Sequence, residues 1–147
     1  MQRRGLLTFA LAAAGGIFAL SGKRAQAAPP DKQKVVYHLS DADKVAFVLG
    51  NIRNHYEGVG GPEHVTIALV VHGPALKAFQ TAQSNPDLAR RVGEFHKDGL
   101  EMNACGNTMK ATKITLADLL PGFIAAEQGG VVRLAELQGQ GYVYLRP

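Results

Sequence analysis

The chain contains a single cysteine, Cys105, which ends an apolar stretch and directly precedes Gly106. A thiolate is the cysteine species that attacks sulfur or binds soft metal ions. Gly106 allows a sharp turn, after which the amides of Asn107 and Thr108 could face the sulfur and favour its thiolate form. Asn103, Gly106, Asn107 and Thr108 are therefore candidate binding residues around a candidate nucleophile. The alternative is that Cys105 is a buried, unreactive apolar side chain.

Two histidines stand at similar places in the sequence. His38 and His72 each end an apolar, β-rich stretch and precede a turn or a helix start. In His72-Gly73-Pro74, the following helix N-terminus could bind an anion, so His72 and Gly73 join His38 as candidate substrate-binding residues. The alternative is that each histidine only caps a strand or makes a partly buried hydrogen bond.

Several other chemistries have little support. The sequence has no Gly-x-Gly-x-x-Gly or phosphate-loop pattern and no Cys-x-x-Cys pair, so neither nucleotide binding nor dithiol chemistry is indicated. One cysteine also excludes an internal disulfide. Cys105 with His72 and His38 could hold copper or zinc, for which mixed sulfur and imidazole ligands are suitable, but no closely spaced ligand pair accompanies them. We expect no cofactor and no resident metal.

Residues 1–27 have the three parts of a secretory signal. The Arg3-Arg4 pair precedes an apolar run over residues 9–20, and Ala25-Gln26-Ala27 supplies a small-x-small cleavage pattern. The apolar run is shorter than the ~20 residues that span a bilayer. The paired arginines favour the twin-arginine route. We therefore expect cleavage after Ala27, a periplasmic mature protein, and no stable membrane insertion.

The mature part has no net charge. The whole chain has 16 basic and 12 acidic residues, and residues 1–27 contain four of the basic ones and no acidic one. Twelve basic residues then balance twelve acidic ones. The basic isoelectric point belongs to the signal, so we expect no nucleic-acid partner, which would require a basic face on the folded domain.

The elements that must position these side chains alternate along residues 28–147. Hydrophobic patterns predict strands at residues 34–39, 65–71, 100–104, 123–126 and 142–145, and helices at 40–56, 74–79, 85–99, 115–120 and 131–137. This alternation predicts one α/β domain with a mostly parallel, roughly five-stranded sheet and helices on both faces, in a flavodoxin-like layering. Right-handed crossovers would gather His38, His72 and Cys105 at one edge of the sheet.

Three segments resemble the DsrE/DsrF-like family: residues 70–74 (VVHGP), residues 102–109 (MNACGNTM) and residues 141–147 (GYVYLRP). The resemblance extends over essentially the whole mature domain, and the Cys-Gly-Asn-Thr segment is its most specific part. It implies a small doubly wound α/β fold that forms oligomers. It also implies a sulfur-relay role, in which Cys105 would carry a persulfide or related adduct between partners.

The leading hypothesis is therefore a periplasmic sulfur carrier or sulfurtransferase-like protein in which Cys105 accepts and passes on sulfane sulfur. Its expected partners are further copies of the chain and a sulfur donor or acceptor protein. Two alternatives stay open: a copper- or zinc-binding module, and a non-catalytic oligomeric binding subunit in which Cys105 only packs.

Overall fold

The computed structural model describes residues 32–147. The signal peptide predicted at residues 1–27 lies outside the described residues. Among the described residues, no helix combines the length and apolar composition needed to cross a bilayer.

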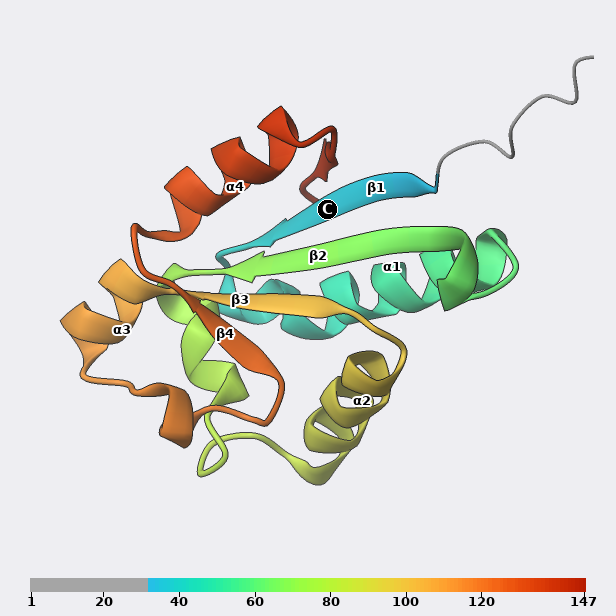
Figure 1. The fold of residues 1–147 in the computed structure, drawn as a ribbon. Helices are drawn as coiled ribbons and strands as arrows, with labels where there is room; N and C mark the ends of the chain where they lie inside the picture. The colour runs from blue at the N-terminus through green and yellow to red at the C-terminus, as the bar shows by residue number, and fades with distance from the viewer. Residues whose placement is uncertain (1–31) are drawn as a thin grey trace, which may run out of the picture. The chain divides into compact units, whose positions relative to one another are not determined.

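Five parallel strands form one sheet, shown edge to edge in Figure 1. The central strands β1 and β2 are rich in β-branched and apolar residues, as the sequence predicts. In chain order the strands are β1 (Gln33–Leu39), β2 (Val65–Val71), β3 (Glu101–Cys105), β4 (Phe123–Ala126) and β5 (Val143–Leu145). In space they follow the order β4-β3-β2-β1-β5. The predicted five-stranded parallel sheet is thus confirmed.

Four α-helices connect the strands: α1 (Val45–Gly58), α2 (Pro86–Lys97), α3 (Gly106–Thr112) and α4 (Gly130–Gly139). Helix α2 begins as expected, because the Asn85 side chain accepts a hydrogen bond from the Leu88 amide at 2.8 Å. Two details differ from the sequence expectation. Helix α3 starts directly after Cys105, where only a turn was expected, and the helix predicted at residues 115–120 is a single 3₁₀ turn, Leu116–Asp118.

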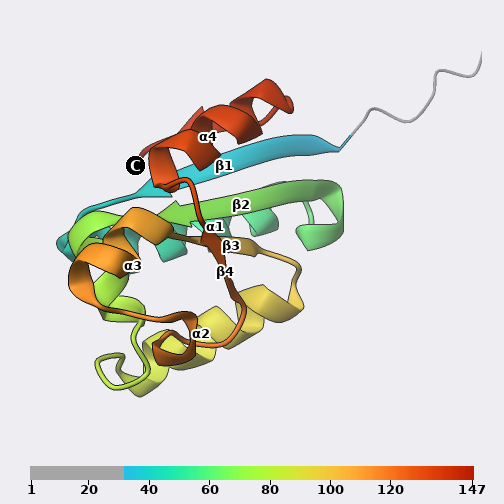
Figure 2. The same ribbon diagram turned by 60° about the vertical axis from the view of Figure 1, so that its left-hand side comes forward.

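The strand order explains why helices cover both faces. The chain steps from β1 to β2, β3 and β4 in one direction and then returns past β1 to place β5 at the opposite edge. Because crossovers between parallel strands are right-handed, a reversal of direction moves the connection to the other face. Helices α1 and α2 therefore share one face, and α4 lies alone on the other, as Figures 1 and 2 show.

The core is divided unequally between these two faces. The α1 and α2 face contains most of the buried apolar side chains, with Phe79, Phe95 and Ile52 fully enclosed. The α4 face has a small cluster, comprising Val36, Ala68, Val70, Leu134 and Leu137. Burial of the larger cluster supplies most of the hydrophobic stabilisation, whereas the thinner α4 layer leaves room for polar side chains near the strand ends.

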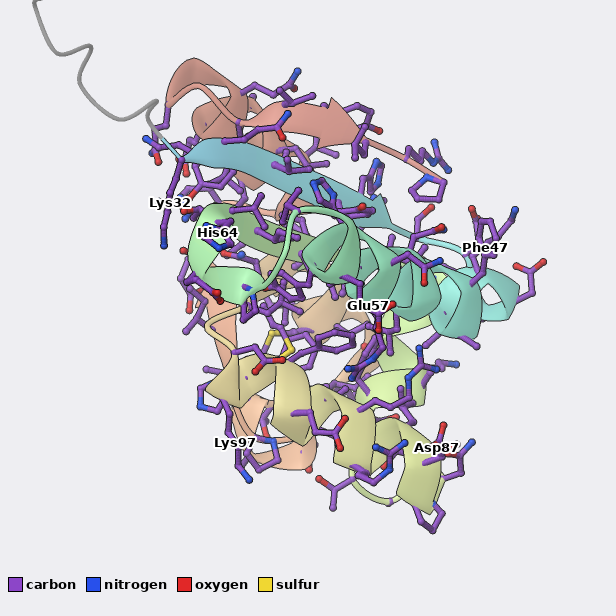
Figure 3. All side chains as sticks on the ribbon, turned by 90° about the vertical axis from the view of Figure 1, so that its right-hand side faces the viewer. Lys32, Phe47, Glu57, His64, Asp87 and Lys97 are labelled. Carbon is purple, nitrogen blue, oxygen red and sulfur yellow. The ribbon has the colours of Figure 1, made fainter. Side chains whose placement is uncertain are left out.

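The outer surface of the α1 and α2 layer is mainly polar. In Figure 3, Glu57 on α1 and Asp87 and Lys97 at the two ends of α2 lie on the outside of the fold. Phe47 is the exception, because 55% of this apolar side chain is exposed. This side of the domain therefore has a conventional solvated surface, and the chemistry-bearing residues lie elsewhere.

Gly106, the first residue of α3, provides a test of how tightly the sheet edge is packed. A Cβ at this position would stand 2.9 Å from the Ala126 carbonyl oxygen and 3.0 Å from that of Glu127. We expect Gly106→Ala to lower the free energy of unfolding by about 1–3 kcal/mol, because backbone atoms must move. Gly50→Ala in α1 is the control: no atom lies within 4 Å of its Cβ, and it should add about 0.5–1 kcal/mol. Urea unfolding measures both, and equal effects of the two changes would contradict the packing described.

Candidate functional site

His38, His72 and Cys105 lie on the same face and at the same edge of the sheet. His38 lies two residues beyond Val36, and His72 two beyond Val70, and both valines pack beneath α4. Cys105 lies two beyond Asn103, which is paired with Val70 in the register of β2 and β3. Because side chains alternate between faces along a strand, all three point to the α4 face, as the sequence analysis expected for the edge.

The sulfur of Cys105 accepts a hydrogen bond from the first residue of α4. The Gly130 amide nitrogen lies 3.1 Å from the sulfur in a buried contact. A Cβ on residue 130 would lie 3.3 Å from the Cβ atoms of both Cys105 and His72. The Cβ atoms of Cys105 and His72 are therefore at most twice that distance apart. A Cβ at residue 130 would crowd both side chains, so glycine at this position favours the close start of α4.

Groups on α3 also act on the thiol. Burial raises the pKa of Cys105, but the Thr108 hydroxyl and the amides of Thr108, Gly130 and Asn107 together outweigh burial and lower the pKa below its usual value. Cys105 occupies the N-cap position of α3, where a side chain faces the first amides of the helix. The Thr108 hydroxyl accepts from the Gly73 amide at 2.9 Å, which leaves its hydrogen available to the sulfur. The site therefore favours the thiolate.

The two histidines contact each other. The Nε2 atoms of His38 and His72 lie 2.5 Å apart, and the rings stack with centroids separated by 4.7 Å. The Nδ1 atom of His38 lies 2.6 Å from the Tyr144 hydroxyl on β5. Tyr144, His38 and His72 thus form a hydrogen-bonded chain that crosses three neighbouring strands toward Cys105.

Both imidazoles are held in their neutral form. Burial, with the charges of His72 and Arg146, lowers the pKa of His38 to about 4, and Asp41 opposes this shift. Burial, followed by Arg146, also lowers the pKa of His72. The short contact agrees with this state, because only one of the two Nε2 atoms can carry a proton at this distance.

A polar network fixes α4 on the sheet. The Arg133 guanidinium donates to the Asn103 amide oxygen at 3.0 Å and to the Glu101 carboxylate at 2.8 Å. The Asn103 side chain is 1% exposed and also donates to Glu101 at 3.0 Å. Asn103 thus uses its hydrogen-bonding groups to hold α4, and through α4 the Gly130 amide, beside the sulfur.

The other candidates surround helix α3. Gly73 and Thr108 line a cavity of about 350 Å³ on one side of it. Gly106 lines a larger, mainly apolar cavity of about 520 Å³ between α3 and β4, with Lys110 and Lys113 at its border. The side-chain amide of Asn107 lies against Gly129: a Cβ on Gly129 would stand 2.5 Å from the Asn107 Nδ2 atom. The structure therefore places every sequence-predicted site residue within one continuous region around Cys105.

This region does not form an evident metal centre. Among residues 32–147, no three His, Cys, Asp or Glu side chains are grouped so that they could hold a metal ion. The two histidines direct Nε2 toward each other, and the sulfur accepts from an amide. The mixed sulfur and imidazole ligand set considered from the sequence is not assembled in the described residues.

Four contributors were not identified as site residues from the sequence: Gly130, Arg133, Tyr144 and Arg146. The Gly129-Gly130 pair before the last helix was the available signal for close approach of α4. Arg146 donates to the Ser40 hydroxyl at 3.1 Å and lies 3.4 Å from the Asp41 carboxylate. No local pattern indicates that contact, because the partners are about a hundred residues apart.

The depressed pKa of His38 predicts a pH dependence of stability. The unfolded chain binds a proton at His38 near pH 6.5, whereas the folded protein does so only near pH 4. Stability is therefore lost as the pH falls through this window. We expect wild type to lose on the order of 1–2 kcal/mol more than His38→Gln between pH 6.5 and 4, a value reduced for partial solvent screening.

Chemical unfolding at several pH values measures this difference. The control His64→Gln removes an exposed histidine and should keep the wild-type pH dependence. Parallel curves for wild type and His38→Gln would contradict a neutral, buried His38.

Comparison with known proteins agrees with the fold. The structure is similar to MTH1491 from Methanobacterium thermoautotrophicum, a protein of unknown function, with a TM-score of 0.68 and 26% identity over 78% of this chain and 99% of that one. It is also similar to the YchN protein of E. coli, with a TM-score of 0.65 and 16% identity, again over 78% of this chain and 99% of that one. A third similar structure is BT1422 from Bacteroides thetaiotaomicron. Its TM-score is 0.56 and its sequence identity 16%, over 78% of this chain and 95% of that one.

A comparison with curated proteins found no match. The sequence profile of the DsrE/DsrF-like family, however, matches residues 27–147, which include both histidines, the cysteine segment and the final strand. With the doubly wound sheet and the placement of Cys105 at its edge, this match establishes that the chain belongs to the DsrE/DsrF-like family.

Proposed function

We propose that the protein is a periplasmic sulfur carrier in which Cys105 accepts sulfane sulfur as a persulfide and passes it on. Membership of the DsrE/DsrF-like family suggests a sulfur-relay-like role. The observation that carries the proposal is the setting of the chain's single cysteine, whose sulfur accepts the Gly130 amide at 3.1 Å and whose pKa is lowered. The twin-arginine-like signal of residues 1–27 supports the compartment.

The reaction needs no oxidant. The Cys105 thiolate attacks the outer sulfur of a persulfide R–S–SH, a new S–S bond forms, and R–S⁻ leaves with the electron pair of the broken bond. The product is Cys105–S–SH, and total charge is unchanged. Delivery to an acceptor thiolate reverses these roles and regenerates the Cys105 thiolate. A lowered pKa favours both steps, because it increases the thiolate fraction and improves Cys105 as a leaving group.

The two alternatives have weaker support. A soft-metal module lacks a cluster of three ligands in the described part of the chain. A purely structural cysteine gives no reason for amides and a hydroxyl to favour the thiolate form, since a buried packing thiol has a raised pKa.

Loading of Cys105 is measured by intact mass. We expect the mature protein incubated with polysulfide to gain about 32 Da per sulfur atom, reversed by a thiol reductant, as persulfidation is. Cys105→Ser should fold normally and gain nothing. An equal gain in Cys105→Ser, or no gain in wild type, would refute the sulfur-acceptor role.

The role of Thr108 is tested on the thiol itself. Thr108→Val removes the hydroxyl that acts on Cys105 and accepts from Gly73. We expect the pKa of Cys105 to rise and its alkylation by iodoacetamide at pH 7 to slow. Thr112→Val is the matched control, because the Thr112 hydroxyl donates only to the Thr108 carbonyl, at 2.7 Å within the same helix. The alkylation rates of both variants and wild type are measured from pH 5 to 9. Identical pH profiles for Thr108→Val and wild type would contradict the role of the Thr108 hydroxyl in lowering the pKa of Cys105.

A further inference from the structure

Four neighbouring strands each contribute one polar group to the same edge. In spatial order these are Tyr144 on β5, His38 on β1, His72 just after β2 and Cys105 on β3. The first three are joined by hydrogen bonds of 2.6 and 2.5 Å. The sulfur-carrier role uses only Cys105 of this row, so the hydrogen-bonded chain that leads toward it has no assigned purpose.

Tyr144, at one end of the hydrogen-bonded row, determines which atom donates the proton in each hydrogen bond. A phenol hydroxyl is a good donor, and an imidazole nitrogen is a stronger base than a phenol oxygen, so Tyr144 donates to Nδ1 of His38. His38 must then carry its proton on Nε2 and donate to Nε2 of His72. His72 must in turn carry its proton on Nδ1. The hydrogen-bonded chain therefore gives His72 one defined tautomer, in which Nδ1 is the N–H donor.

The residue that carries this donor lies close to the reacting cysteine. The Cβ atoms of His72 and Cys105 each lie 3.3 Å from the position that a Cβ on Gly130 would occupy. Arg146 adds a positive charge that both histidines sense, and the Ser40 hydroxyl and the Asp41 carboxylate hold its guanidinium at this edge. The Asp41 carboxylate acts on both histidines and raises the pKa of each. A neutral donor and a held cation suit a ligand that accepts hydrogen bonds and is anionic.

The burial of the sulfur limits the size of that ligand. Only 6% of Cys105 is exposed, and Gly130 covers one side of it. A small inorganic donor can reach such an atom, whereas a thiol within a folded protein would require α4 to move.

We propose that Tyr144 and His38 are positioning residues that make His72 a neutral hydrogen-bond donor to a small anionic sulfur donor at Cys105, with thiosulfate as the representative. This inference rests on the sulfur-acceptor role. In the reaction, the Cys105 thiolate attacks the outer sulfur of thiosulfate, the bond to the sulfonate sulfur breaks, and sulfite leaves with the electron pair. Cys105–S–S⁻ and sulfite carry the same total charge as the reactants. The His72 N–H and Arg146 stabilise the charge that develops on the leaving sulfite oxygens.

Two reagents separate this role from a general effect on the thiol. Thiosulfate is anionic, whereas iodoacetamide is neutral and needs no hydrogen-bond donor. We expect Tyr144→Phe and His72→Phe to slow thiosulfate loading about three- to tenfold, the range of one lost hydrogen bond. Alkylation should stay within about twofold of wild type. Tyr142→Phe, the neighbouring tyrosine whose ring lies 5.8 Å from the Lys34 ammonium, is the matched control and should change neither rate.

The tautomers give a second measurement that does not depend on turnover. Nitrogen-15 NMR of histidine-labelled protein at pH 7 should show the proton of His38 on Nε2 and that of His72 on Nδ1. Tyr144→Phe should mix the tautomers of both rings. A His72 proton on Nε2 in wild type would overturn the inference.

The kinetic outcomes also distinguish the two proposals. Thiosulfate loading that is unchanged in Tyr144→Phe and His72→Phe, or slowed in parallel with alkylation, overturns the role of the chain and leaves Cys105 as the acceptor. Failure of wild type to load from either thiosulfate or polysulfide, with normal alkylation, overturns the acceptor role and this inference with it.

Discussion

The close approach of α4 to the carboxyl ends of the strands is the interaction on which the site depends. The Gly130 amide reaches the Cys105 sulfur at 3.1 Å because residue 130 has no side chain. Gly129, with φ of 105°, supplies the preceding turn in a conformation that favours glycine. A side chain at residue 130 would crowd Cys105 and His72, and one at residue 129 would be strained by the positive φ. Two adjacent glycines thus determine the local chemistry of a cysteine 25 residues away.

The topology places α4 on the face of the sheet where this approach occurs. A chain that returns from β4 past β1 must cross the sheet on the face opposite to α1 and α2. The returning helix starts at the strand ends, beside Cys105, and the small apolar cluster under it leaves space for Asn103 and Arg133. Their hydrogen bond, together with Glu101, holds α4 in register. The same return places β5 beside β1, which brings the Tyr144 hydroxyl to His38 and Arg146 to the loop after β1.

Much of this was readable from the sequence. The five strands, their parallel arrangement and the convergence of His38, His72 and Cys105 follow from hydrophobic patterns and crossover handedness, and the structure confirms the fold. The hydrogen-bond chain was not readable, because it joins residues 34 and 106 positions apart, whose pairing depends on strand order. Helix α3 was also missed, because its seven residues, Gly106–Thr112, are too few to show a clear helical pattern. Asn103 was expected near a ligand, whereas its position suits the anchoring of α4.

The central claim is that the sulfur bound at Cys105 is carried and delivered rather than trapped. Transfer from the isolated, loaded protein tests this most directly. Wild type would be loaded with thiosulfate labelled isotopically at its outer sulfur, freed of reagent, and mixed with a small acceptor thiol while the masses of both are followed. We expect the label to leave the protein and appear on the acceptor in a single step, with return of Cys105 to its free form. Retention of the label on the protein would show a dead-end adduct and contradict the carrier role.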